Sequence, residues 1–180
     1  MKFRRLSIPD VVLFEPEIFS DHRGELFESF NEKKFTEAIG RQVQFVQENH
    51  SISSQGVLRG LHYQEPHQQG KLVRVIQGEI FDVAVDIRPD SLTYGRWVAE
   101  KLSSKNKKLL WVPEGFAHGF LVLSETAEVN YKLTDFYNPE CEKCILWNDQ
   151  DLGIDWPNTS APKLSLRDEN ALPFSKLSIK

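Results

Sequence analysis

The sequence contains few cysteines: Cys141 and Cys144 form a single Cys-x-x-Cys motif. No second cysteine pair and no histidine at zinc-finger spacing accompanies them, so the ligands of a structural zinc site are missing. A redox motif would open a helix, whereas residues 142–147 read as a turn that leads into a strand. We therefore expect two reduced thiols in a loop.

Long apolar segments and runs of basic charge are missing as well. No stretch approaches the ~18 apolar residues that a transmembrane helix needs, which excludes such a span. No apolar segment follows the basic residues at positions 1–5, so we expect no secretory signal and a cytoplasmic location. The chain has 22 basic and 26 acidic residues without a run of five basic ones. We therefore expect neither a nucleic acid nor a membrane as partner.

The length and composition are those of one globular domain. The chain has 180 residues, of which 40% are hydrophobic and 27% are charged. A chain of this length buries roughly 70% of its extended-state surface on folding, so it needs neither a disulfide nor a metal to be stable. We expect a single domain over residues 1–180.

One helix is predicted near the N-terminus. Asn31 is suited to cap it, and Phe35, Ala38 and Ile39 form an apolar stripe at helical spacing. Gly40 is suited to end it.

Short strands make up most of the remaining chain. Eight candidates lie between turn residues with almost no helix between them, and such a pattern predicts an antiparallel sandwich or barrel. A polar C-terminal stretch from Asn148 is expected to pack on the outside as loop and short helix. The strand candidates are residues 42–54, 57–64, 71–77, 81–87, 95–102, 108–112, 119–123 and 127–134.

Polar side chains interrupt several strand faces that should point inward. Polar groups that point into an apolar interior must be paired or must line a ligand site, and several of them together favour a ligand site. By period-2 counting, Gln47, Asn49 and Ser51 continue a face begun by Val43 and Phe45, Tyr131 continues the face of Ala127 and Val129, and Lys71 shares a face with Val73 and Val75.

Two histidines are candidates for chemistry. His62 follows Arg59 on one strand, and the two can reach one pocket only if Gly60 marks a bulge or the strand ends near Leu61. His118 ends a Pro-x-Gly-x-x-His turn, which is similar to the second half of the cupin metal-binding pattern. The first half would need His-x-His, whereas this chain has a glutamine at position 64. A metal site is therefore hard to assemble, and we expect no metal.

Seven separated blocks resemble the dTDP-4-dehydrorhamnose 3,5-epimerase family. The resemblance covers about residues 8–170 in order, and the agreement of several blocks makes it specific. The blocks are Gln47-Glu48-Asn49-His50-Ser51, the runs at 56–64, 70–74 and 78–88, Pro113 to Phe120, Leu146-Trp147-Asn148-Asp149 and Leu164-Ser165-Leu166-Arg167-Asp168.

The resemblance implies an all-β, cupin-type jelly-roll barrel that works as an isomerase without metal or other cofactor. Its substrate would be dTDP-4-dehydro-6-deoxy-D-glucose, on the route to dTDP-L-rhamnose. It implies that His62 accepts a proton with Asp168 as its partner, that Tyr131 donates a proton, and that Lys71 and His118 lie near the sugar carbonyl. The implied substrate contacts are Arg23, Glu28, Gln47, Asn49, Arg59, Tyr137, Glu142 and Arg167.

The resemblance also implies a homodimer whose N-terminal strands cross between subunits, so that Arg23 and Glu28 serve the partner's pocket. Arg167 stands where lysine can occur in the family, and the Cys141–Cys144 pair is not part of the family pattern. Three alternatives stay open: an epimerase that inverts one carbon or uses another nucleotide sugar, a metal-dependent cupin enzyme, and a non-catalytic binder of nucleotide sugars.

Overall fold

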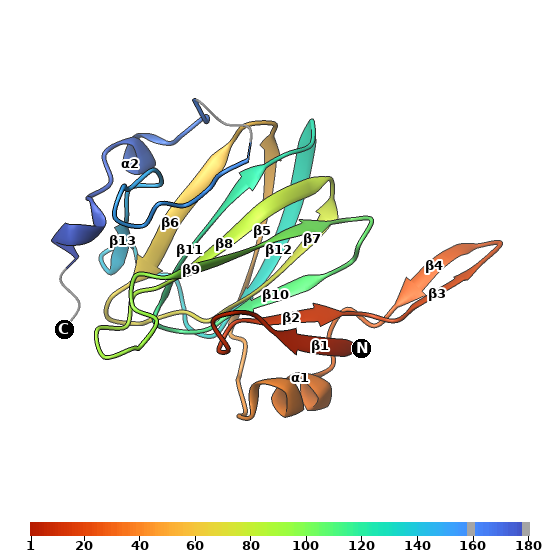
Figure 1. Ribbon diagram of the computed structural model, residues 1–180. Helices are drawn as coiled ribbons and strands as arrows, with labels where there is room; N and C mark the ends of the chain where they lie inside the picture. Colours follow the sequence, from red (N-terminus) through yellow and green to blue (C-terminus); the bar gives the residue numbers. More distant parts are fainter. Residues whose placement is uncertain (158–160, 178–180) are drawn as a thin grey trace.

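The computed structural model describes residues 1–157 and 161–177, which form two facing antiparallel sheets and a projecting hairpin (Figure 1). The six-stranded sheet has the order β1-β2-β10-β7-β12-β5. Its strands are β1 (Lys2–Arg5), β2 (Val12–Glu15), β5 (Gln47–Ser54), β7 (Lys71–Gln77), β10 (Leu109–Val112) and β12 (Thr126–Leu133).

The second sheet has five strands in the order β13-β6-β11-β8-β9. Among the described residues no strand pairing joins the two sheets, and the predicted jelly-roll class is confirmed. The strands of the second sheet are β6 (Leu58–Gln64), β8 (Glu79–Asp86), β9 (Trp97–Ser103), β11 (Phe116–Val122) and β13 (Glu142–Cys144), and the projecting hairpin consists of β3 (Ile18–Asp21) and β4 (Gly24–Phe27).

Three apolar clusters hold the layers together. The first fills the space between the sheets, and Val73, Leu110 and Phe120 belong to it. The second covers the outer face of the five-stranded sheet with residues of the C-terminal segment such as Trp156. β11 contributes to both of these clusters, which explains why all seven of its residues are buried.

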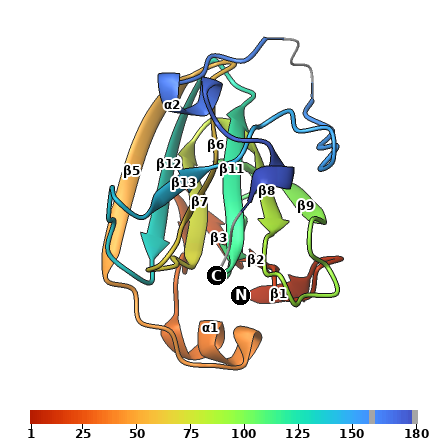
Figure 2. The same cartoon turned by 90° about the vertical axis from the view of Figure 1, so that its left-hand side faces the viewer.

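The predicted helix is confirmed as α1 (Glu32–Ile39), with the Asn31 side chain capping its first turn and Gly40 ending it at a φ of 78°. Its apolar face builds the third cluster on the outer face of the six-stranded sheet. Figure 2 shows α1 and the short helix α2 (Leu166–Glu169) at opposite ends of the molecule. A 3₁₀ turn, η1 (Phe174–Lys176), follows α2. No helix in the described part of the chain is long and apolar enough to cross a bilayer.

The predicted start of the 42–54 strand is wrong. The strand β5 begins only at Gln47, and Val43 and Phe45 pack with Phe35 of α1 instead of sharing the inner face. These two side chains bury the apolar side of α1, because the chain passes the helix before it joins the sheet.

The structure has a bulge at Gly60, which is one of the two conditions for Arg59 and His62 to share a pocket. Between β6 and β11 the register shifts, with His62 opposite His118 but Arg59 opposite Phe120. Leu58 and Leu61, three positions apart, both belong to the outer cluster. The extra residue therefore places Arg59 and His62 together on the inner face.

The close approach at this bulge gives a testable prediction. A methyl group on Gly60, whose φ is 134°, would lie 2.5 Å from the Gly119 Cα atom on β11. Backbone atoms cannot move aside cheaply, so Gly60→Ala is expected to destabilise the fold by roughly 1–3 kcal/mol. Gly56→Ala is the control, because φ is also positive there (78°) but no atom lies within 4 Å of the added methyl group. Equal melting temperatures for the two variants would contradict the packing argument.

Candidate active site

The polar inward positions predicted from the sequence meet between the two sheets. In the five-stranded sheet, His62 on β6 lies opposite His118 on β11. In the six-stranded sheet, Tyr131 on β12 lies opposite Asn49 on β5. Lys71 on β7 bridges the sheets, because its Nζ donates to the backbone oxygen of His62 at 3.2 Å. Both sheets thus contribute ionisable groups to one region.

A histidine–carboxylate dyad lies on the side of the five-stranded sheet. The His62 Nε2 and Asp168 Oδ1 atoms are 2.6 Å apart. Asp168 is nearly fully buried, while 29% of the His62 side chain is exposed. Ser165 caps α2 by accepting a bond from the Asp168 backbone, which fixes where the carboxylate points. Burial alone would raise the pKa of Asp168, but hydrogen bonds, chiefly with His62, hold it below its usual value.

Cys144 joins this dyad, so the expectation of a loop thiol is wrong. It lies on β13 directly opposite His62, and its Sγ donates to Asp168 Oδ1 at 3.3 Å. Burial and the neighbouring carboxylate raise the pKa of the Cys144 thiol well above its usual range. Cys141 is buried, and both thiols are free as expected.

A second histidine–carboxylate pair lies deeper. His118 Nε2 is 2.7 Å from Asp82 Oδ1, and both side chains are buried. Burial lowers the pKa of His118 against the opposing effect of Asp82 and so favours the neutral imidazole. Burial also lowers the pKa of Lys71 to about 8, again opposed by Asp82. The interior therefore holds an ammonium group that can lose its charge at mildly alkaline pH.

A chain of amides fixes the phenol of Tyr131. The Nδ2 of Asn49 donates to the Tyr131 Oη at 3.4 Å, and the Nε2 of Gln47 donates to the Asn49 Oδ1 at 2.9 Å. The Gln47 Oε1 accepts from the backbone of Tyr137 at 2.8 Å. Because the Tyr131 oxygen accepts the Asn49 bond, its own proton is available to another group.

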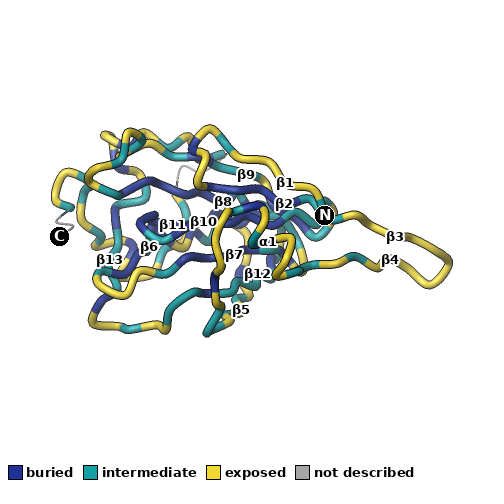
Figure 3. Tube along the Cα trace, turned by 90° about the horizontal axis from the view of Figure 1, so that it is seen from below, coloured by how far each residue is buried: buried dark blue, intermediate teal, exposed yellow. Residues whose placement is uncertain are grey.

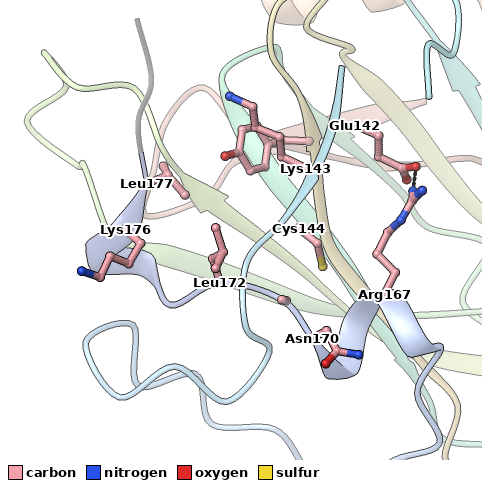
Figure 4. Close-up of a pocket in the computed structure, with 10 residues that line it drawn as sticks. Glu142, Lys143, Cys144, Arg167, Asn170, Leu172, Lys176 and Leu177 are labelled. Carbon is pink, nitrogen blue, oxygen red and sulfur yellow. Dashed lines mark ion pairs between the residues drawn. The ribbon is translucent and has the colours of Figure 1, made fainter. Parts of the chain in front are cut away.

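Polar groups beyond the phenol extend the site toward the surface. The Tyr137 hydroxyl donates to Glu142 Oε2 at 2.7 Å, and the same carboxylate pairs with Arg167. Figure 4 shows this pair at the edge of a cavity of about 400 Å³, bounded by β13, α2 and the segment after it. Arg59 Nε donates to Ser53 Oγ at 3.1 Å and thereby spans from β6 to β5.

The comparisons with known proteins identify the family. A sequence model described as dTDP-4-dehydrorhamnose 3,5-epimerase matches residues 5–176. A protein of that name from Pseudomonas aeruginosa is 59% identical over 175 residues, covering 97% of both chains. The chain belongs to the dTDP-4-dehydrorhamnose 3,5-epimerase family.

Solved structures of the epimerase family have the same fold. A dTDP-6-deoxy-D-glucose-3,5-epimerase from Legionella pneumophila in complex with dTDP-4-keto-L-rhamnose superposes with a TM-score of 0.95 at 47% identity, covering 98% of this chain and 94% of that one. A 3'-monoepimerase from Streptomyces bikiniensis in complex with dTDP-quinovose gives 0.89 at 37% identity, with 95% and 87% covered. The fold therefore accommodates enzymes named for inversion at one carbon as well as at two.

Two residues implied by the likeness to the epimerase family lie apart from the site within this chain. Arg23 is in the turn of the β3–β4 hairpin, where it pairs with Asp21. Glu28 follows the hairpin and pairs with Lys34 of α1. Figure 1 shows the hairpin projecting away from the sheets, and Figure 3 shows both of its strands exposed.

Sequence reasoning missed two residues that lie at this candidate site. On β8, Asp82 occupies an inward position between apolar residues that point outward. A polar residue on a buried inner face is a sequence signal that could have identified it. The contact of Cys144 with the dyad had no such signal, because it depends on how β13 and α2 pack.

Proposed function

We propose that this chain inverts both C3 and C5 of dTDP-4-dehydro-6-deoxy-D-glucose, which gives dTDP-4-dehydro-L-rhamnose. The observation that carries the proposal is the division of groups between the sheets. The imidazole of the dyad is on one sheet with its carboxylate on the adjoining helix α2, and the fixed phenol is on the other sheet. A hexose ring between them would meet a base on one face and an acid on the opposite face.

The chemistry requires this arrangement. The ketone at C4 acidifies the hydrogens on C3 and C5, and removal of either gives an enolate whose charge lies on the former carbonyl oxygen. Return of a proton to the same face restores the substrate, whereas return to the opposite face inverts the carbon. An epimerase of this type therefore needs two proton-transfer groups across the ring and a cationic or hydrogen-bonding group at the oxygen.

His62 is the base in this proposal. With Nε2–H donated to Asp168, the lone pair of the neutral imidazole is on Nδ1, free to take the proton from carbon. The buried carboxylate fixes this tautomer and stabilises the imidazolium that forms. After inversion the imidazolium passes its proton to water and the Tyr131 phenolate takes up a proton from water, so exchange with solvent is expected.

Tyr131 is the acid, with Asn49 and Gln47 holding its phenol in place. Lys71 and His118 act at the carbonyl oxygen. In a site from which water is excluded, such groups typically contribute several kcal/mol to the stabilisation of the developing charge. Because no step is a net oxidation or reduction, the reaction needs no redox cofactor.

The remaining polar residues would bind the nucleotide. Arg59 and Arg167 supply guanidinium groups, which suit the two phosphates of the dTDP moiety. Tyr137 is 47% exposed and offers its ring as a stacking surface for thymine. Glu142 positions both Tyr137 and Arg167 through the bonds described above.

The proposal includes a homodimer of single-domain chains, residues 1–180, acting in the cytoplasm. The hairpin exposes large apolar side chains, with Phe19 60% and Leu26 73% exposed. A second copy of the chain would cover them and would receive Arg23 and Glu28 beside its own site. Such exposed apolar side chains on a projecting hairpin favour an interface.

Lys71 gives a pH prediction. Its pKa is about 8, so the ammonium form that stabilises the enolate is lost as the pH rises through that value. We expect kcat to fall about tenfold per pH unit above pH 8. The Lys71→Met variant is expected to lower kcat by roughly 10²–10³ and to remove this fall of kcat at alkaline pH. Lys132→Met is the control, because Lys132 points to the opposite face and pairs with Glu48. An unchanged fall of kcat above pH 8 in Lys71→Met would contradict the assignment of Lys71 to the carbonyl oxygen.

The activity itself is tested in deuterated water. The purified protein is mixed with the 4-keto sugar nucleotide, and the C3 and C5 protons are followed by NMR, with a reductase to trap the product as dTDP-L-rhamnose. Loss of both proton signals and formation of the rhamnose product are expected. Exchange at one carbon alone would identify a monoepimerase, and binding without exchange would identify a non-catalytic protein.

A further inference from the structure

Three side chains with different ligand atoms converge at the dyad. His62, Cys144 and Asp168 come from β6, β13 and α2, and each offers one nitrogen, sulfur or oxygen atom within 4.8 Å of the others. Asp168 is buried, and the other two are half-buried. This set shares His62 with the cupin pattern considered in the sequence, but Cys144 and Asp168 are not part of that pattern.

We propose that His62, Cys144 and Asp168 bind a thiophilic divalent cation such as Zn²⁺, and that the bound cation inhibits the epimerase. Imidazole, thiolate and carboxylate are all zinc ligands in proteins. The mixed set of one sulfur, one nitrogen and one oxygen favours Zn²⁺ over Mg²⁺ and Ca²⁺, which take oxygen ligands.

The present distances are close to those that a tetrahedral site requires. Zinc bonds of about 2.0–2.3 Å at tetrahedral angles put neighbouring ligand atoms roughly 3.3–3.6 Å apart. Asp168 Oδ1 is 3.3 Å from Cys144 Sγ and 2.6 Å from His62 Nε2. The distance between His62 Nε2 and Asp168 Oδ1 therefore has to lengthen by less than about 1 Å, which the exchange of a hydrogen bond for a metal bond would drive, and all three ligand atoms already lie within 4.8 Å of one another.

Binding is balanced in protons and charge. The Cys144 thiol releases its proton to water and its sulfur forms a bond to the cation, while the neutral imidazole and the carboxylate each donate a lone pair. One thiolate and one carboxylate neutralise the two positive charges of the ion. The net charge of the site therefore changes by one positive unit, from the single negative charge of the carboxylate to neutrality.

Inhibition follows from the imidazole. If Nε2 binds the cation, its proton must move to Nδ1, and no lone pair is left for the substrate. If Nδ1 binds the cation, the base is blocked directly. In both cases His62 can no longer accept a proton from carbon. This consequence rests on the proposed function, whereas binding of the cation does not.

The test uses the full-length protein after EDTA treatment. We expect one Zn²⁺ per chain by calorimetry, a reversible loss of epimerase activity, and recovery with EDTA. Co²⁺ serves as the spectroscopic probe, because a cobalt–thiolate bond gives a charge-transfer band in the near ultraviolet. Mg²⁺ at the same concentration is expected neither to bind at this site nor to change the activity.

Matched cysteine variants decide the outcome. Cys144→Ser is expected to lose the cobalt band and to weaken Zn²⁺ binding at least tenfold, whereas Cys141→Ser keeps both. Inhibition is scored against the metal-free rate of each variant. Absence of the band in the unmodified protein, its persistence in Cys144→Ser, or equal zinc inhibition of both variants would overturn the proposal. Failure of the 4-keto sugar to react would instead refute the proposed function, and the cobalt band would still report on the metal site.

Discussion

Replacement of His62 by asparagine is expected to reduce turnover by roughly 10²–10⁴-fold and to stop solvent deuterium from entering C3 and C5. Both losses arise from one cause, because the imidazole held by Asp168 at 2.6 Å is the group that takes the proton from carbon. An asparagine amide fills similar space and can still bond to Asp168, but it has no basic nitrogen. The fold and the binding of dTDP are therefore expected to stay intact.

The measurement is the rate of proton exchange by NMR, together with dTDP affinity by calorimetry. His50→Asn is the matched control, since His50 is also on a strand but lies 48% exposed beside Glu128. This control should exchange at the normal rate. Full exchange in His62→Asn would show that another group is the base.

Replacement of Tyr131 by phenylalanine is expected to separate exchange from inversion. The base on the opposite face can still remove the C5 proton and return deuterium to the same face, so exchange should fall by less than about tenfold. Inversion at C5 needs the phenol proton, and we expect product formation to fall about 100-fold or more. Asn49 would lose its 3.4 Å bond to the phenol oxygen, while the ring would keep its packing against the core.

Exchange and product are measured in the same NMR time course. Tyr94→Phe is the control, because Tyr94 stacks on Phe174, outside the site described above, and should behave as the unmodified enzyme. Equal losses of exchange and product in Tyr131→Phe would mean that Tyr131 supports the structure of the site and does not deliver the proton.

Most of the strand pattern could be predicted from local periodicity. The alternation on β8 and the turns around it predicted a strand at 81–87, and the structure has one at Glu79–Asp86. The capping residues Asn31 and Gly40 predicted both ends of α1 to the residue. These features depend on neighbouring residues along the chain, and such residues are visible in a sequence.

Features that depend on tertiary packing could not be predicted in the same way. β1 and β2 have four residues each, too few to show a period. Val43 and Phe45 alternate as a strand would, yet they cover α1 because the helix lies where no local signal could place it.

The site was predicted unevenly for the same reason. The inward polar faces followed from spacing, whereas spacing put Arg59 and His62 on opposite faces and only the structure showed the bulge at Gly60 that brings them together. The pairing of His62 with Asp168 spans 106 positions, and only the family resemblance implied it. The positions of Asp82 and Cys144 beside the two histidines emerged only with the three-dimensional structure.

A crystal structure with a bound dTDP-linked 4-keto sugar would test the central claim most directly. The account predicts the hexose between the sheets, with His62 Nδ1 and Tyr131 Oη on opposite faces of the ring, each about 3–3.5 Å from the carbon it serves. A hexose with both groups on one face, or with either side chain turned away from it, would contradict the account.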